Sequence, residues 1–370
     1  MDGQHIGGGE PLSSRRLVVF VVVVVALAAL LPASAAQAGP IRDGRTLLSC
    51  PDPTVLDAHV GGYRYYLSCT SDVAPNAFPL RGSNDLVHWH RLGYVFPAGQ
   101  EPWWAQTSPR GRFWAPALYR IEHRWVIYFA AQYDPRKLRL SYATGGPVSS
   151  STMLIGVATA TSLHGPWQSR VLHYRGQFNG IDREKERYGG VIDPSVGRDT
   201  ATGQLYLFWA EQHSSIWVTA LSPDGLTISP AIHQALIARH GWECATPRGT
   251  CVIEGPEETF RDGWFYLFFS GGSTWTGTYA IGVGASRNPL VSQFRLLDNG
   301  PALRSGGGYI GPGGSSAPVT APDGEEEIFY HAMIGPNPRH VSGDRYLFSS
   351  PIFWQGKRGL DPRIGSGVVS

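Results

Sequence analysis

Short hydrophobic runs separated by polar turns recur along most of the chain, and they have the length of strands rather than of helices. Five of these runs are rich in aromatic residues: Tyr63 to Ser68, Trp125 to Ala130, Leu205 to Ala210, Trp264 to Ser270 and Glu327 to Ala332. Four further runs follow them: Phe78 to Ser83, Ile155 to Ala160, Ile216 to Ala220 and Ile281 to Ser286. The pattern predicts many short antiparallel strands and an all-β fold.

A proline-containing motif precedes each aromatic run. The repeating prolines are Pro53, Pro116, Pro194, Pro256 and Pro318. Twelve residues after them stand Tyr65, Tyr128, Tyr206, Phe268 and Tyr330. Units of about sixty residues with three or four strands are typical of propeller blades. The sequence therefore predicts a single-domain, five-bladed β-propeller whose innermost strands carry these prolines, since an innermost strand is an edge.

The second interval between prolines is longer than the others. It spans 78 residues, against 62 or 63 elsewhere, and the extra residues fall near 170–190. Within this insertion the charged run 182–187 is interpreted as a solvated loop, with a rim over the substrate as the alternative.

The N-terminus has the order of a secretory signal. Arg15 and Arg16 precede the apolar run Leu17 to Leu31, and Ala36-Gln37-Ala38 follows as a cleavage box. The run is short for a membrane span, so we expect cleavage after Ala38 and secretion, with a retained membrane anchor as the alternative. The expected organisation is a signal peptide at 1–38, a connection at 39–48, the propeller at 49–357 and a tail at 358–370.

Charge and cysteine content narrow the function classes. The 31 basic and 29 acidic residues give a net charge of +2, which disfavours non-specific nucleic-acid binding. Four cysteines in an exported chain indicate disulfides. The sequence contains no C-x-x-C motif, which a cysteine-ligated metal site would be expected to have. We predict the pairs Cys50–Cys69 and Cys244–Cys251. A hairpin turning at 60–62 would bring positions 50 and 69 nearly opposite each other.

Three carboxylates accompany the repeating prolines: Asp52, Asp193 and Glu254. In a propeller they would converge on the axis, where like charges raise one another's pKa unless they bind something or share a proton. Each could instead cap a local turn, but three such positions together favour a functional site. Glu257 and Glu258 lie close by, and strand alternation predicts that Glu254 and Glu258 share a face while Glu257 points the other way.

In order and spacing, these motifs resemble glycoside hydrolase family 43, the five-bladed propeller arabinanases, α-L-arabinofuranosidases and β-xylosidases. The similar stretches are 52–53, 83–89, 114–116, 192–196, 253–256, 311–313 and 329–332. The resemblance implies that Asp52 is the general base, Glu254 the general acid and Asp193 the residue that tunes the pKa of the acid. It also implies an inverting mechanism, in which one carboxylate activates water and one carboxylic acid protonates the leaving oxygen.

Two positions depart from the family pattern. Ala117 stands where many members have Asp, which suggests a changed contact below the sugar pocket. Gly314 replaces a His that in many members ligates or neighbours an axial metal ion. No cofactor is expected for catalysis, and a structural axial calcium becomes doubtful. His331 is interpreted as a packing or supporting residue rather than a metal ligand.

Aromatic side chains in the funnel could stack on sugar rings. Trp114, Trp209 and Trp275 are the candidates by position, together with the pair Trp103-Trp104, and core packing between blades is the alternative for each. Motifs for phosphate binding, zinc peptidases and serine hydrolases are missing from the sequence. The expected partner is a polysaccharide or oligosaccharide, the protein is expected to be a monomer, and no nucleic acid or membrane partner is expected after signal cleavage.

The expected function is a secreted inverting glycosidase acting on arabinose- or xylose-containing plant polysaccharides, with α-L-arabinofuranosidic linkages preferred. The turn-and-tryptophan pattern of 89–114 resembles arabinan-active members, and the chain lacks the extra sandwich domain of many β-xylosidases. A β-xylosidase and a non-catalytic carbohydrate-binding propeller are the alternatives. A retaining fructosidase is disfavoured, because Pro51, Ile192 and Gly255 stand where those propellers have Asn, Arg and Cys.

Overall fold

The structure is a computed structural model of the whole chain. It describes residues 39–43, 46–71, 74–107, 112–178, 190–211, 215–239, 241–274, 276–298, 300–335, 345–355 and 361–365. They all belong to one compact unit, residues 36–370. The expected signal peptide at 1–38 and the charged run 182–187 lie outside the described residues.

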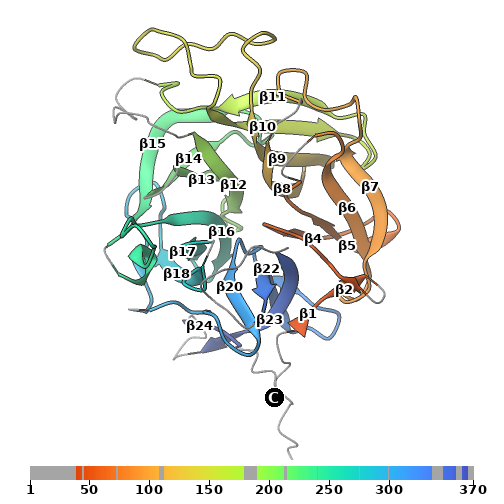
Figure 1. Cartoon of the computed structure of the whole chain (residues 1–370), viewed down its shortest axis with the longest axis vertical. Helices are drawn as coiled ribbons and strands as arrows, with labels where there is room; N and C mark the ends of the chain where they lie inside the picture. Colours follow the sequence, from red (N-terminus) through yellow and green to blue (C-terminus); the bar gives the residue numbers. More distant parts are fainter. Residues whose placement is uncertain are drawn as a thin grey trace, which may run out of the picture. The chain divides into compact units, whose positions relative to one another are not determined.

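Five antiparallel sheets form the five blades of a β-propeller (Figure 1). Blade 1 contains β4 (Thr54–Val60), β5 (Tyr63–Ser68), β6 (Ala77–Ser83) and β7 (His90–Phe96). Blade 2 contains β8 (Phe113–Ile121), β9 (Arg124–Gln132), β10 (Met153–Ala160) and β11 (Gln168–His173). Blade 3 contains β12 (Val191–Arg198), β13 (Leu205–Glu211), β14 (Ser215–Leu221) and β15 (Ile228–Ile237). Blade 4 contains β16 (Ile253–Arg261), β17 (Trp264–Gly271), β18 (Ala280–Ser286) and β19 (Arg295–Leu296).

Blade 5 is assembled from both ends of the described chain. It contains β20 (Tyr309–Gly313), β21 (Val319–Thr320), β22 (Glu326–Ile334), β23 (Tyr346–Gln355), β24 (Asp361–Ile364) and the N-terminal β1 (Gly39–Pro40). β1 pairs with β23, so the segment that precedes blade 1 is hydrogen-bonded into blade 5 and closes the ring. A small separate hairpin follows, formed by β2 (Arg42–Asp43) and β3 (Thr46–Leu47).

The predicted all-β, five-bladed fold is confirmed. Every predicted aromatic run is a second blade strand, and the aromatic residue twelve positions after each repeating proline is buried. In Figure 1 the inner strands β4, β12, β16 and β20 lie toward the centre, while β7 and β15 lie toward the rim. One short 3₁₀ helix, η1 (Trp242–Cys244), is present among the described residues.

The inner strands share one backbone feature where they enter the blade. A residue with positive φ, between 46° and 57°, stands at Asp52, Ala115, Asp193, Gly255 and Gly314. In blades 1 to 4 this residue directly precedes the repeating proline. In blade 5 it precedes Ser315, and Ser316 pairs with Phe329 of β22. The prediction that Pro318 is the fifth equivalent proline is therefore wrong, because the repeated feature is the left-handed residue and not the proline itself.

The hydrophobic core is divided among the blade interfaces. Clusters of buried side chains join every neighbouring pair of blades, two of them between blades 2 and 3, and one joins blade 5 to blade 1 through Tyr65, Leu67, Phe329 and Leu347. Aromatic side chains bury the largest apolar area per residue, so they suit these wedge-shaped contacts. Rigid contacts on both sides of every blade hold the inner strands in fixed positions around the axis. No helix within the described ranges is long and apolar enough to cross a membrane.

Candidate active site

A cavity of about 800 Å³ opens where the inner strands begin. All five blades contribute to its wall, through Asp52, Ala115, Asp193, Glu254 and Gly314. The three carboxylates predicted from sequence therefore line one cavity.

Asp52 and Asp193 occupy the same position in their blades, directly before the repeating proline, whereas Glu254 stands two residues before its proline. Asp52 and Asp193 are themselves left-handed residues, a conformation that Asp tolerates better than most side chains. Glu254 stands one residue before the left-handed Gly255. At the two remaining equivalent positions, Ala115 has only a methyl group and Gly314 has no side chain.

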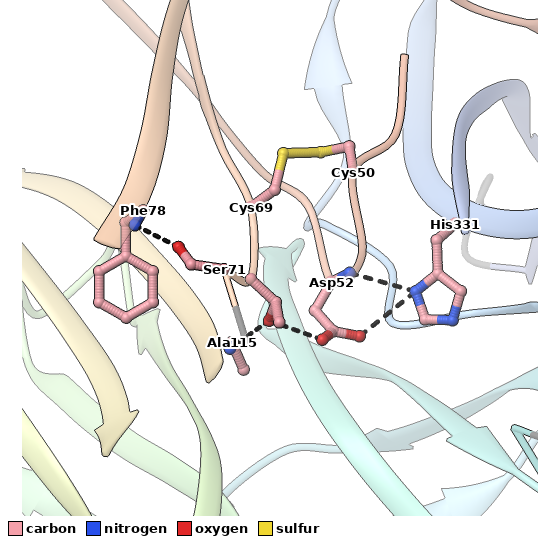
Figure 2. The surroundings of a disulfide bond; sticks show 8 residues. Cys50, Asp52, Cys69, Ser71, Phe78, Ala115 and His331 are labelled. Carbon is pink, nitrogen blue, oxygen red and sulfur yellow. Dashed lines mark hydrogen bonds and ion pairs between the residues drawn. A yellow bond between two sulfur atoms is a disulfide. The ribbon is translucent and has the colours of Figure 1, made fainter. Parts of the chain in front are cut away.

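Asp52 is held by contacts with Thr70, Arg345 and His331, and Figure 2 shows its contacts with His331. The Thr70 hydroxyl donates to Oδ2 at 2.7 Å, and Arg345 donates to Oδ1 at 3.1 Å. The backbone N–H of Asp52 donates to Nδ1 of His331 at 3.1 Å, and the same ring nitrogen lies 3.3 Å from Oδ1. Thr70 also accepts from the N–H of Ala115, which links blade 1 to blade 2 beside the carboxylate.

These contacts keep Asp52 ionised. Burial acts to raise its pKa, but the Arg345 guanidinium and the Thr70 hydroxyl hold the pKa of Asp52 well below its usual range. Burial and the nearby Arg345 in turn lower the pKa of His331, so this ring is neutral near pH 7. Asp52 is thus a carboxylate whose orientation is fixed and whose side chain remains 23% exposed to the cavity.

Asp193 and Glu254 behave in the opposite way. Burial, with Glu254 and Asp52 as neighbouring charges, raises the pKa of Asp193 well above its ordinary value. Burial and the charge of Asp52 likewise raise the pKa of Glu254. The Tyr279 hydroxyl, which donates to Oε1 at 2.7 Å, acts in the opposite direction and lowers this pKa. The backbone N–H of Gly255 donates to Oδ2 of Asp193 at 2.9 Å. The pair therefore retains a proton at a higher pH than two isolated carboxyl groups would.

The alternation predicted for the glutamates of β16 is wrong. A bulge between Glu254 and Glu257, with Gly255 at φ 57°, shifts the strand register. Glu254 and Glu257 therefore both line the cavity, while Glu258 is buried and accepts from the Ser195 hydroxyl at 3.0 Å. Burial raises the pKa of both Glu257 and Glu258 well above the ordinary value.

Only one of the predicted sugar-stacking tryptophans has a described place in the cavity. Trp114 lines the wall, with the Arg112 guanidinium 5.2 Å from its ring centre. Trp209 is 2% exposed and packs 4.7 Å from the ring of His173, so its predicted role in substrate binding is wrong. Trp275 lies outside the described residues. In the other predicted pair, Trp103 is 57% exposed and Trp104 is buried against Phe129.

The space around Gly314 does not fit the axial histidine of the family pattern. A Cβ at this position would lie 2.6 Å from Oδ1 of Asp52 and 2.7 Å from Nδ1 of His331. His331 from β22 thus fills this side of the axis and contacts Asp52 directly. Within the described ranges, no group of three or more His, Cys, Asp or Glu could hold a metal ion. The ring nitrogen Nδ1 of His331 already accepts from the N–H of Asp52, so it is engaged within the protein. Ala117 is buried in the cluster between blades 2 and 3.

Three features of the cavity were missed from sequence. Tyr279 and Arg345 both line the wall, and neither belongs to the proline-containing motif. The third is a rim loop, residues 244–251, which contributes Thr246, Pro247, Arg248 and Thr250 to the wall. The Cys244–Cys251 pair was the only sequence signal for this loop.

Both predicted disulfides are present. Cys50–Cys69 joins the segment before β4 to the end of β5, two residues from Asp52, with a Cα separation of 5.2 Å (Figure 2). It closes a loop with a sequence separation of 19, which corresponds to a stabilisation of about 3 kcal/mol through the unfolded state. Cys244–Cys251 closes the rim loop.

The site combines an ionised, oriented carboxylate with a carboxyl pair that retains a proton. Such an arrangement can perform acid–base chemistry on a bond held between the groups, because one can accept a proton while the other donates one.

Comparison with known proteins gives the family. Residues 46–357 match Glycosyl hydrolases family 43. The Bacillus subtilis protein named Extracellular endo-alpha-(1->5)-L-arabinanase 1 is 26% identical over 278 residues, covering 71% of this chain and 75% of that protein. An Aspergillus fumigatus protein named Probable arabinan endo-1,5-alpha-L-arabinosidase B is 28% identical over 339 residues, covering 82% of this chain and 83% of that protein.

Solved structures share the fold. A thermostable family-43 glycoside hydrolase has a TM-score of 0.69 at 21% identity, covering 90% of this chain and 97% of that chain. The Cellvibrio cellulosa alpha-L-arabinanase complexed with arabinohexaose has a TM-score of 0.60 at 20% identity, covering 86% and 96%. With the family match spanning most of its length, the chain belongs to glycosyl hydrolase family 43 and is a glycosidase that hydrolyses glycosidic bonds.

Proposed function

We propose that the protein is a secreted, inverting glycosidase that cleaves α-L-arabinofuranosidic linkages in plant arabinan or its oligosaccharides. In this proposal Asp52 is the general base, Glu254 the general acid, and Asp193 raises the pKa of the acid. The main support for the proposal is that carboxyl groups in one cavity have pKa values shifted in opposite directions. The pKa of Asp52 is lowered, while the pKa values of Asp193 and Glu254 are raised.

The proposed reaction balances within these groups. Asp52 takes a proton from water as the water oxygen attacks the anomeric carbon. Glu254 gives its proton to the glycosidic oxygen as the bond from that oxygen to the anomeric carbon breaks. The proposal assigns the proton that this coupled pair retains to Glu254 and the negative charge to Asp193, where the N–H of Gly255 stabilises that charge.

The arabinan preference rests on the relatives, two of which are named as arabinan-cleaving enzymes. Secretion is supported by the N-terminal signal pattern and by two disulfides, which form in oxidising compartments. Trp114 offers an aromatic ring to a bound sugar. Catalysis uses these side chains alone, and the mature chain is proposed to act as a monomer.

A substrate panel tests the proposal. Purified protein is incubated with linear α-1,5-arabinan, arabinoxylan, xylan and the 4-nitrophenyl glycosides of α-L-arabinofuranose and β-D-xylose, and the products are separated by chromatography. Release of arabinose or arabino-oligosaccharides, lost in the Asp52→Asn variant, is the expected result. Release of xylose alone would make the protein a β-xylosidase, and binding of polysaccharide without turnover would make it a carbohydrate-binding propeller.

A further inference from the structure

The phenol of Tyr279 lies between the two halves of the proposed machinery. Its hydroxyl donates to Oε1 of Glu254 at 2.7 Å. Its ring stacks on His331 at 5.8 Å between centres, with an angle of 15° between the planes, and His331 contacts Asp52. A single tyrosine therefore contacts the proposed acid directly and the proposed base through one intervening ring.

The surroundings of Tyr279 leave it one position. The side chain is 3% exposed. Gly313, the strand partner of His331, leaves room for the ring, since a Cβ at that glycine would overlap it. The ring is thus enclosed by the backbone of β20 and by His331, so its hydroxyl reaches Glu254 with little freedom to turn away.

We propose that Tyr279 is a positioning residue for Glu254: by donating to Oε1 it leaves the transferable proton on Oε2, the oxygen that would face the glycosidic bond. A phenol hydroxyl donates a single hydrogen, and the oxygen of a carboxylic acid that accepts it best is the carbonyl oxygen. The hydroxyl therefore selects which oxygen of the acid is protonated. This inference rests on the proposed role of Glu254.

The same hydrogen bond has a second consequence after proton transfer. Once Glu254 has lost its proton, the Tyr279 hydroxyl donates to a full carboxylate, and hydrogen bonds to charged acceptors are the stronger ones. Burial together with the neighbouring Glu254 charge raises the pKa of Tyr279 well above its usual value, so the hydroxyl keeps its hydrogen throughout. The contact thus favours the deprotonated acid and lowers the pKa of Glu254 relative to a site without it.

Several other groups face Glu254. Asp52 raises its pKa, Arg345 lowers it, and Asp193 is the partner of the carboxyl pair. All of them remain when only the hydroxyl of Tyr279 is removed. The variant Tyr279→Phe therefore isolates the one contact, and Tyr128→Phe is the matched control, because it removes a buried hydroxyl that donates to the Gly225 carbonyl at 2.7 Å, between blades 2 and 3.

The test uses the full chain and two readouts. In the first, the side-chain carboxyl of Glu254 is titrated by carbon-13 NMR and identified by its loss in Glu254→Gln. We expect a higher pKa of Glu254 in Tyr279→Phe than in the wild type, and no change in Tyr128→Phe. An unchanged or lower pKa in Tyr279→Phe would overturn the proposal. Because this readout needs no turnover, it decides the matter even if the wild type cleaves none of the sugars tested.

The second readout is the rate on substrates with different leaving groups. For arabinan, we expect kcat of Tyr279→Phe to fall about tenfold, with the alkaline limb of the pH profile moved to higher pH. For a 2,4-dinitrophenyl glycoside the loss should be much smaller, because that leaving group needs little protonation. Equal losses on both would assign Tyr279 a merely structural role.

If Tyr279→Phe does not fold, 3-fluorotyrosine at position 279 replaces it. The fluorinated phenol is a stronger hydrogen-bond donor of nearly the same size, so it should lower the pKa of Glu254. A pKa that does not fall would then overturn the proposal.

Discussion

Replacing Gly314 by alanine tests whether the position of Asp52 depends on the absence of a side chain at this glycine. The added methyl carbon would lie 2.6 Å from Oδ1 of Asp52 and 2.7 Å from Nδ1 of His331. Real Cβ contacts are longer than this, so the side chains of Asp52 and His331 must move. The N–H of Gly314 is held by the Ser270 hydroxyl at 2.8 Å, which keeps the backbone from yielding instead.

The expected cost has two parts. An alanine at φ 53° costs about 1–2 kcal/mol for the left-handed backbone. Forcing a methyl group into a filled site adds about 1–3 kcal/mol. For a chain of this size 1 kcal/mol corresponds to about 1.5 °C in Tm, so Gly314→Ala should lower Tm by about 3–7 °C. A displaced Asp52 should lower kcat/KM on arabinan by about 10- to 100-fold.

Gly203→Ala is the matched control. This glycine also has positive φ, 79°, but a Cβ there would meet nothing within 4 Å. It carries the backbone cost alone, so Tm should fall by about 2–3 °C with kcat/KM changed less than about twofold. Thermal unfolding and arabinan hydrolysis are measured on both variants. Activity of Gly314→Ala equal to that of Gly203→Ala would refute the reasoning that links Gly314 to Asp52.

Three further perturbations have defined directions. Arg345→Gln removes the cation that lowers the pKa of Asp52, so the acid limb of kcat/KM should move to higher pH; an unmoved limb would exclude this guanidinium as its cause. Asp193→Asn removes a negative charge beside Glu254, so the alkaline limb should move to lower pH, and a shift to higher pH would contradict the proposed coupling. Replacing both cysteines of the rim loop, residues 244–251, by serine removes the disulfide that closes this loop. KM for arabinan should rise about three- to tenfold while KM for a 4-nitrophenyl glycoside stays constant. Equal changes on both substrates would exclude a role of this loop in holding the polymer.

The repeat predicted the blades well because each blade uses the same local chemistry. A short edge strand, a turn and a buried aromatic strand are all readable within about twenty residues. The fifth blade shows the limit of this reasoning. There Gly314 adopts the left-handed φ that the residue before the proline adopts in the other blades, but Ser315 follows it, and a search for proline finds Pro318 instead.

Residues of the candidate site could be predicted from sequence where they stand next to the repeated proline motif. Asp52, Asp193 and Glu254 stand beside the repeating prolines, so the strands that bring the prolines to the axis bring the carboxylates too. Glu257 was assigned to the wrong face because alternation assumes a regular strand, and the bulge at Gly255 breaks it.

Contacts between distant segments could not be predicted. Arg345 reaches Asp52 from 293 residues away along the chain, and Tyr279 reaches Glu254 from the connection that precedes β18. Neither residue carries a local pattern that distinguishes it from other arginines and tyrosines. The prediction that Trp209 binds substrate was wrong for a related reason. A tryptophan on a blade strand can face the axis or a neighbouring blade, and only the packing in the folded protein decides between the two.

The stereochemistry of the first product tests the central claim most directly. Proton NMR can follow hydrolysis of an α-L-arabinofuranoside in the minutes before mutarotation mixes the anomers. If Asp52 activates water opposite the bond that Glu254 protonates, the β-anomer of the released sugar must appear first and decline toward equilibrium. First appearance of the α-anomer would mean that a carboxylate attacks the sugar itself, and it would contradict the assignment of Asp52 as base.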